Sequence, residues 1–427
     1  MDQLARDTGF VQRRSKLSGD SFLQSLVLNE LDYSSLTLQE ICCKLQGQYA
    51  IEISKQGLDQ RFNEAAVDFF KAVLSLKLSK QITNGSLDCL EHFKTVKIKD
   101  STRFVAPSTL SEKYPSHGAG GHLAGLSIAY EFDLKSGRIA DLSIHPSIRQ
   151  DHVDAKENLS TIQPGDLLIR DLGFISVEVL SEIEKRKAFY VNRLHTNTSI
   201  YEVENERFVK MDYYKMYRFM KKHSLLRHEK QVFIGDHQKL PVRMILEMLP
   251  DDEVAKRLRK MNQKAKRSNW KVSKSYKSKA YFNLFVTNAE SSMLPAEEIG
   301  AYYKLRWQIE LMFKVFKSTF HIHELKPMSP QRYQCHIYAK LIWILISKNI
   351  FDTLNFYSWK TKQRLISIMK MFSHLKNIIS SIELSIIKQD NRSLTKLMTV
   401  FLSFTFKHLF LEMKKDKIGL EHLLKKR

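Results

Sequence analysis

Residues 302–317 read YYKLRWQIELMFKVFK and combine a polar pattern with an apolar one. Tyr303, Arg306, Glu310 and Lys317 follow one another at intervals of three, four and seven residues. On one α-helix, at about 100° per residue, these four side chains fall within an arc of about 60°. A separate apolar stripe is formed by Leu305, Ile309, Met312, Phe316 and Phe320. The stretch therefore predicts one helix that buries one side and presents the four polar groups on another.

The four polar groups suit one kind of chemistry. A carboxylate can hold a divalent metal ion, while Arg and Lys bind phosphate oxygens. Reactions at a phosphodiester use both. For any one of the four residues, a solvated face over a core stripe is the simpler interpretation, so the functional prediction depends on the complete pattern.

The complete pattern resembles the Y-(2)-R-(3)-E-(6)-K signature of bacterial insertion-sequence transposases of the insertion-sequence-four group. The resemblance extends from about Asp100 to Lys317. It implies a DDE enzyme with a ribonuclease-H-like core, in which three acids bind metal. It also implies metal-dependent cut-and-paste transposition, with cleavage at the ends of a DNA element and strand transfer to target DNA.

The resemblance assigns the three catalytic and metal-binding acids to Asp100, Asp171 and Glu310. Asp100 ends an alternating strand in KIKDST, and Asp171 ends an apolar strand in LLIRDLGF. We expect the three carboxylates to bind Mg²⁺, with Mn²⁺ as a substitute, because hard cations prefer oxygen ligands. Taken singly, Asp100 is better explained as a strand-terminating turn residue and Asp171 as an acid paired with Arg170, so the assignment depends on the whole pattern.

The resemblance also implies that Tyr303, Arg306 and Lys317 contact phosphates at the element ends. Trp307 lies just outside the polar arc, and we expect it to pack against a neighbouring element.

In related enzymes an aromatic side chain of the insertion stacks on a flipped base. The strand that leaves the insertion here begins with Tyr281 and Phe282, and the nearest Trp lies upstream at Trp270. The stacking residue, and with it a hairpin intermediate, therefore stays open.

The charge of the chain points to a polyanionic partner. Its 427 residues include 68 Lys and Arg against 46 Asp and Glu, giving a formal charge of +22 and a pI near 9.6. Nucleic acid and an anionic membrane surface are both compatible with this excess. The longest apolar run, near residues 341–346, falls far short of the roughly 20 residues that span a bilayer.

Two further features favour the cytoplasm. The first residues, MDQLARDTGFVQRRSK, contain no hydrophobic signal segment. The cysteines, Cys42, Cys43, Cys89 and Cys335, show no spacing typical of a zinc site or a disulfide framework. We therefore expect a cytoplasmic, nucleoid-associated protein with reduced thiols.

The excess positive charge is concentrated in residues 256–279, which contain eleven Lys and Arg and no acid. Basic residues interleaved with aromatic ones suit a DNA-binding groove, so Lys266, Arg267 and Trp270 are candidate DNA contacts. A solvated loop explains this composition equally well.

The first 94 residues are expected to be a helical DNA-binding region. One helix should bury Leu45 and end at Gly47, and Ser54 should cap a second, short helix. A helix-turn-helix of this kind would direct four polar side chains to the major groove, namely Lys55, Gln56, Gln60 and Arg61. A plain helical hairpin is the alternative.

The remaining pattern predicts an α/β protein. Strands and helices alternate through residues 95–196 in the order of a ribonuclease-H-like core with a mixed sheet. Residues 197–280 form a β-rich insertion, residues 281–320 complete the core with the signature helix, and residues 321–427 form a helical C-terminal region.

The partners implied are double-stranded DNA, as terminal inverted repeats and as target, and a second copy of the chain in a synaptic homodimer. Two alternatives stand beside the transposase. One is a transposase-derived DNA-binding protein without catalysis, and the other is a structure-selective nuclease on the same fold.

Overall fold

The computed structural model describes residues 1–13, 15–28, 37–81, 87, 90–117, 123–194, 198–267, 269, 273–412 and 424. The chain divides into two compact units. Unit 1 consists of residues 1–89, 100–149 and 307–427, and unit 2 of residues 90–99 and 150–306. Strand β1 (Thr95–Ala106) belongs to both, because its residues 95–99 lie in unit 2 and the remainder in unit 1.

Unit 2 contains a mixed sheet. The first half of β1 pairs in parallel with β4 (Asp166–Arg170), which pairs in parallel with β5 (Phe189–Arg193). The sheet continues with antiparallel strands in the order β10 (Phe282–Thr287), β9 (Leu240–Met248), β8 (Arg227–Ile234), β6 (Ile200–Glu204) and β7 (Arg207–Lys210). All five residues of β4 are buried, as its apolar run predicts for a strand in a parallel sheet.

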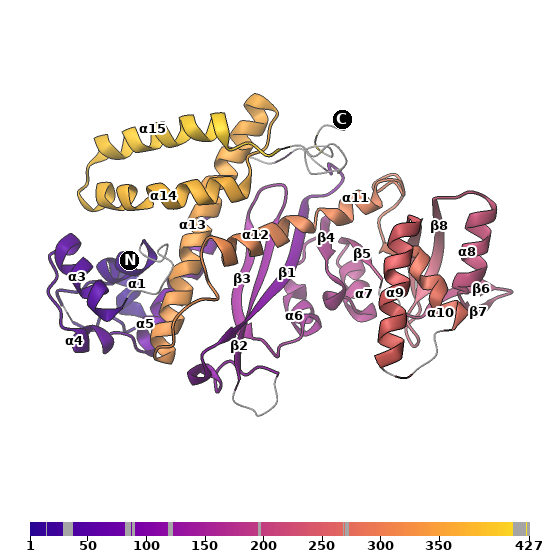
Figure 1. Ribbon diagram of the computed structural model, residues 1–427, viewed down its shortest axis with the longest axis horizontal. Coiled ribbons are helices and arrows are strands. Elements are labelled where there is room, and N and C mark those ends of the chain that lie inside the picture. The colour runs from indigo at the N-terminus through magenta and orange to yellow at the C-terminus, as the bar shows by residue number, and fades with distance from the viewer. Residues whose placement is uncertain are drawn as a thin grey trace. The chain divides into compact units, whose positions relative to one another are not determined.

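The helices of unit 2 lie between these strands in the sequence, except the last, which follows β10 (Figure 1). They are α6 (Asp151–Glu157), α7 (Val177–Lys185), α8 (Tyr213–Lys222), α9 (Asp251–Arg267), α10 (Lys274–Ser278) and α11 (Ile299–Lys304). Apolar side chains of α7 and α8 share one hydrophobic core with the inward side chains of β4, β5, β8, β9 and β10.

Unit 1 contains the antiparallel hairpin of β2 (Ala124–Asp133) and β3 (Ile139–Pro146), with β2 next to β1. Its N-terminal helices are α1 (Asp2–Asp7), α2 (Gly19–Val27), α3 (Leu38–Tyr49), α4 (Lys55–Asp59) and α5 (Glu64–Ser79). Its later helices are α12 (Trp307–Ser318), α13 (Pro330–Lys362), α14 (Ile368–Ile387) and α15 (Asn391–His408). Helix α13 packs on α5 and α2 (Figure 1).

The strand order β3-β2-β1-β4-β5, with an antiparallel hairpin followed by parallel pairs, is that of a ribonuclease-H-like core. The predicted fold class is therefore confirmed. The predicted insertion does contain strands of its own, β6 to β9, and these extend the same sheet through β10.

Three local predictions were wrong. Asp100 does not end its strand, because β1 continues to Ala106. The signature stretch forms two helices, since α11 ends at Lys304 and α12 begins at Trp307. Helix α3 passes through Gly47 and ends only at Tyr49, where the next residue has a left-handed conformation.

The break in the signature stretch has a simple geometry. The Leu305 N–H donates to the Tyr302 carbonyl at 3.0 Å, and the Arg306 N–H donates to the Tyr303 carbonyl at 3.1 Å. These bonds reach back three residues and not four, so the chain tightens between the two helices. No Gly or Pro marks this position, and the apolar periodicity runs through it, which is why the sequence pattern predicts a single helix.

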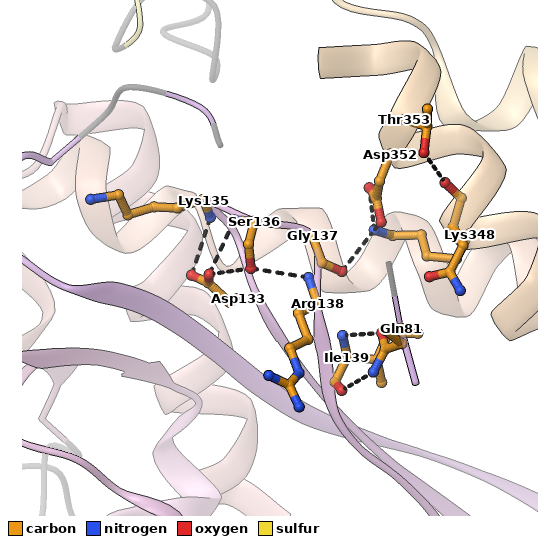
Figure 2. A network of polar contacts seen from close by, with 11 residues as sticks. Gln81, Asp133, Lys135, Ser136, Gly137, Arg138, Ile139, Lys348, Asp352 and Thr353 are labelled. Carbon is orange, nitrogen blue, oxygen red and sulfur yellow. Dashed lines mark hydrogen bonds and ion pairs between the residues drawn. The ribbon is translucent and has the colours of Figure 1, made fainter. Parts of the chain in front are cut away.

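The β2–β3 turn is joined to α13 through one glycine (Figure 2). Gly137 has a φ of +75°, and its carbonyl accepts a hydrogen bond of 3.5 Å from Lys348 Nζ. Lys348 forms an ion pair with Asp352, with both carboxylate oxygens at 2.6 Å. A Cβ atom at Gly137 would overlap the Asp352 carboxyl group. This position therefore needs glycine for its backbone conformation and for its close approach to α13.

We predict that Gly137→Ala destabilises the protein more than Gly9→Ala does. Gly9 has a nearly identical φ of +74°, but a Cβ there would meet no atom within 4 Å. The Gly9 variant should lose about 1–2 kcal/mol of unfolding free energy from backbone strain alone. The Gly137 variant should lose about 1–3 kcal/mol more from overlap. Urea unfolding followed by circular dichroism measures both, and equal losses would contradict the close approach.

Candidate active site

Three predicted site residues come together in unit 2, at the end of β4. Asp171 directly follows this buried strand. Its Oδ1 accepts a hydrogen bond from Tyr303 Oη at 3.5 Å and lies 3.8 Å from Arg306 Nε. The Asp171 side chain is 43% exposed and that of Arg306 only 19%. The carboxylate therefore sits between a phenol and a guanidinium and still has an open side.

Tyr303 is held in place by packing. It belongs to α11, is 8% exposed, and its ring lies 5.7 Å from the ring of Phe285 in β10. Burial, and secondly the charge of Asp171, raises the pKa of the Tyr303 phenol. The phenol therefore stays protonated at neutral pH and acts as a hydrogen-bond donor. The Arg306 guanidinium lies 5.9 Å from the centre of the Tyr303 ring.

The two further residues of the signature pattern belong to unit 1. Glu310 and Lys317 are half-buried on α12. This helix is anchored by Phe313 and Phe316, whose rings lie 6.4 and 5.7 Å from the ring of Tyr130 in β2. This packing sets which side of α12 faces β2, and it thereby sets the direction in which the Glu310 side chain points.

Asp100 is related to Asp171 through the register of β1 and β4. The last pair of these parallel strands joins Lys99 to Arg170. Asp100 is the next residue after Lys99, and Asp171 is the next after Arg170. Each acid is therefore the first residue after the pair of Lys99 with Arg170. The Asp100 carboxylate accepts a hydrogen bond of 2.8 Å from the Ser101 N–H.

The structure adds two residues that the sequence pattern did not single out. Lys99 is fully buried and forms an ion pair of 2.7 Å with Asp154 on α6. Asp154 also accepts a hydrogen bond of 3.1 Å from Asn158. Strand alternation groups Lys99 with Lys97, opposite the apolar Val96 and Ile98, so no signal in the sequence indicated that this charge would be buried.

Asp151 starts α6 and lies close to the turn after β4. A Cβ at Gly173 would come within 2.9 Å of its Oδ2. Because Gly173 has no side chain, Asp151 can approach the segment that carries Asp171.

The remaining predicted DNA contacts lie on surfaces. Lys55, Gln56 and Gln60 are exposed, Arg61 is half-buried, and Ser54 caps α4 by accepting from the Gly57 N–H, as predicted. Lys266 and Arg267 are exposed at the end of α9, whereas Trp270 lies outside the described residues.

The aromatic residues near the site give mixed results. Trp307 is 60% exposed, so the expected packing against a neighbour is wrong. Tyr281 packs on Tyr217 with ring centres 4.2 Å apart, and Phe282 is only 2% exposed. Phe282 is therefore occupied in the core, and Tyr281 is in ring contact.

Two features are absent from the described part of the chain. No three His, Cys, Asp or Glu side chains in it are gathered to hold a metal ion. No helix in it has the length and apolarity needed to cross a membrane.

Known proteins similar to this chain point to one family. The family model described as "Transposase DDE domain" matches residues 91–346. The transposase for insertion sequence element IS231F of Bacillus thuringiensis subsp. israelensis is 32% identical, over 93% of this chain and 86% of that protein. The transposase for IS1151 of Clostridium perfringens is 25% identical, over 95% and 90%. The match of more than half the chain and the identity to these relatives show that it belongs to the DDE transposase family.

Proposed function

We propose that this protein catalyses metal-dependent cut-and-paste transposition, cleaving DNA at the ends of an element and joining those ends to target DNA. The observation that carries the proposal is the half-exposed Asp171 carboxylate between Tyr303 and Arg306, at the end of a buried parallel strand. Carboxyl ends of such strands are common sites of catalysis in α/β sheets.

Asp100, Asp171 and Glu310 are the residues proposed to hold the metal, Mg²⁺ with Mn²⁺ as a substitute. The set fits a hard cation in its chemistry, because every donor is a carboxylate oxygen and Asp171 has an open side. When bound, the metal would activate the attacking oxygen and stabilise the leaving one.

Tyr303 and Arg306 are proposed to position the scissile phosphate. A buried, protonated phenol donates a hydrogen bond to a phosphate oxygen without adding charge. A guanidinium presents five donors in a fixed fork, so it can donate hydrogen bonds to a carboxylate and to a phosphate at the same time. Lys317 would add a further cation, on the same helix as Glu310.

The substrate is proposed to be double-stranded DNA, and two copies of the chain are proposed to hold two element ends. Sequence-specific contacts are assigned to Lys55, Gln56, Gln60 and Arg61, because amide side chains read base edges in the major groove. Lys266, Arg267 and Trp270 remain candidate contacts to the backbone or to bases.

We predict that Asp171→Asn abolishes strand cleavage and preserves binding to element ends, since it removes a ligand charge and keeps the side-chain volume. The assay is incubation with labelled DNA carrying the element termini in Mg²⁺ or Mn²⁺, followed by mapping of product ends. Asp251→Asn, which neutralises an exposed acid at the start of α9, is the control and should cleave normally. Cleavage by Asp171→Asn at the parental rate would refute the site.

Tyr303→Phe should slow cleavage by about 10- to 100-fold, the worth of one hydrogen bond to a charged group. The ring would still pack on Phe285, so stability should change little. Tyr302→Phe is a matched control, because Tyr302 is equally buried and donates instead to Glu298 at 2.5 Å. If both variants slowed cleavage alike, a specific role for Tyr303 would be excluded.

Lys317→Ala should weaken binding to element ends and flatten its salt dependence by about one phosphate contact, a change in slope of about 0.9. Lys388→Ala removes an equal charge from an exposed position after α14 and serves as the control. An unchanged slope for Lys317→Ala in a binding titration across salt concentrations would argue against phosphate contact.

A further inference from the structure

Helix α8 turns one side inward and leaves a basic side exposed. Its inward residues Tyr213, Met216 and Met220 are buried in the hydrophobic core of unit 2. The Asp212 side chain caps the helix by accepting two backbone N–H groups of the first turn. The outer side is therefore carried by a capped helix anchored in the core, which fixes the direction of its side chains.

The outer side carries a strip of cations between two aromatic rings. At about 100° per residue, Lys215, Arg218 and Lys222 lie within an arc of about 60° and extend over about 10 Å of helix. All three are exposed. Tyr214 and Phe219 flank the strip on either side and are 43% and 44% exposed. Such a strip matches a row of phosphates.

The charge on α8 is not balanced by acids of its own segment. Residues 213–228 contain no Asp or Glu. In the described part of the chain, no carboxylate forms an ion pair with Lys215, Arg218 or Lys222. Elsewhere the pattern differs, since Lys256 on α9 has Asp252 and Glu253 at 3.3 and 2.8 Å.

Helix α10 packs beside α8 and extends the positive surface. Its Lys274 and Lys277 are exposed. Lys279 follows it, with Nζ 5.0 Å from the centre of the Tyr213 ring. Burial, and secondly the charge of Lys210, lowers the pKa of Lys279, so cations here are close enough to repel one another.

The geometry points to a second DNA-binding surface on α8 and α10, which takes the backbone of duplex DNA without regard to sequence, as target DNA requires. This inference rests on the proposed function and assigns target DNA as the partner of the surface on α8 and α10. The exposed side of α8 carries no Asn, Gln, Asp or Glu, the side chains that pair with base edges alongside Arg and Lys. Phosphate contacts of this kind position DNA and do not select it. The amides of Gln56 and Gln60, in contrast, suit specific reading.

The test compares the full-length protein with the triple variant Lys215→Ala, Arg218→Ala, Lys222→Ala. Binding to a labelled duplex of unrelated sequence is measured by fluorescence anisotropy across salt concentrations. The slope of log affinity against log salt should become shallower by about 2 to 3, because each lost phosphate contact removes about 0.9. The matched control removes three exposed lysines that pair with acids and lie outside the basic segment 256–279, namely Lys113, Lys185 and Lys370. Its slope should stay unchanged.

Two further measurements separate this inference from the proposed function. The triple variant should still cleave element ends, and Asp171→Asn should bind the unrelated duplex normally. If the parent protein failed to cleave, the duplex titration would still decide the role of α8. An unchanged slope in the α8 variant would overturn the inference. An equal decrease of the slope in the control variant would overturn it as well. So would an α8 variant that binds phosphatidylserine vesicles more weakly than the parent does and binds the duplex equally well.

Discussion

The parallel pairing of β1 with β4 is the constraint on which the proposed site depends. It sets Lys99 opposite Arg170, and the next residue of each strand is a predicted catalytic acid, Asp100 or Asp171. A slip of one residue would turn every side chain of a strand to the other face of the sheet. The buried ion pair of Lys99 with Asp154 opposes such a slip, because breaking it would leave a charge without a partner at a cost of about 3–5 kcal/mol.

Much of the fold was predictable because local chemistry specified it. The apolar run of β4 and the Ser54 cap were both in the sequence and were found as predicted. Strand alternation, however, specifies a buried face and not a neighbour. It could not show that β6 to β9 would extend the core sheet through β10.

The candidate site was predictable only in part. The spacing of Tyr303, Arg306 and Glu310 predicted one helical face, yet α11 ends at Lys304 and α12 begins at Trp307, so Arg306 lies in the break between the two helices. Tyr303 and Arg306 nevertheless meet Asp171, a contact between residues far apart in the sequence. Asp154 was missed, because its importance comes from a partner on β1 that only the fold supplies.

Asp100, Asp171 and Glu310 are proposed to hold divalent metal at one site beside the DNA. Anomalous diffraction from crystals of the protein with element-end DNA and Mn²⁺ would locate that metal. We expect manganese peaks coordinated by carboxylate oxygens of all three residues. Manganese bound elsewhere, or bound without one of these acids, would contradict it.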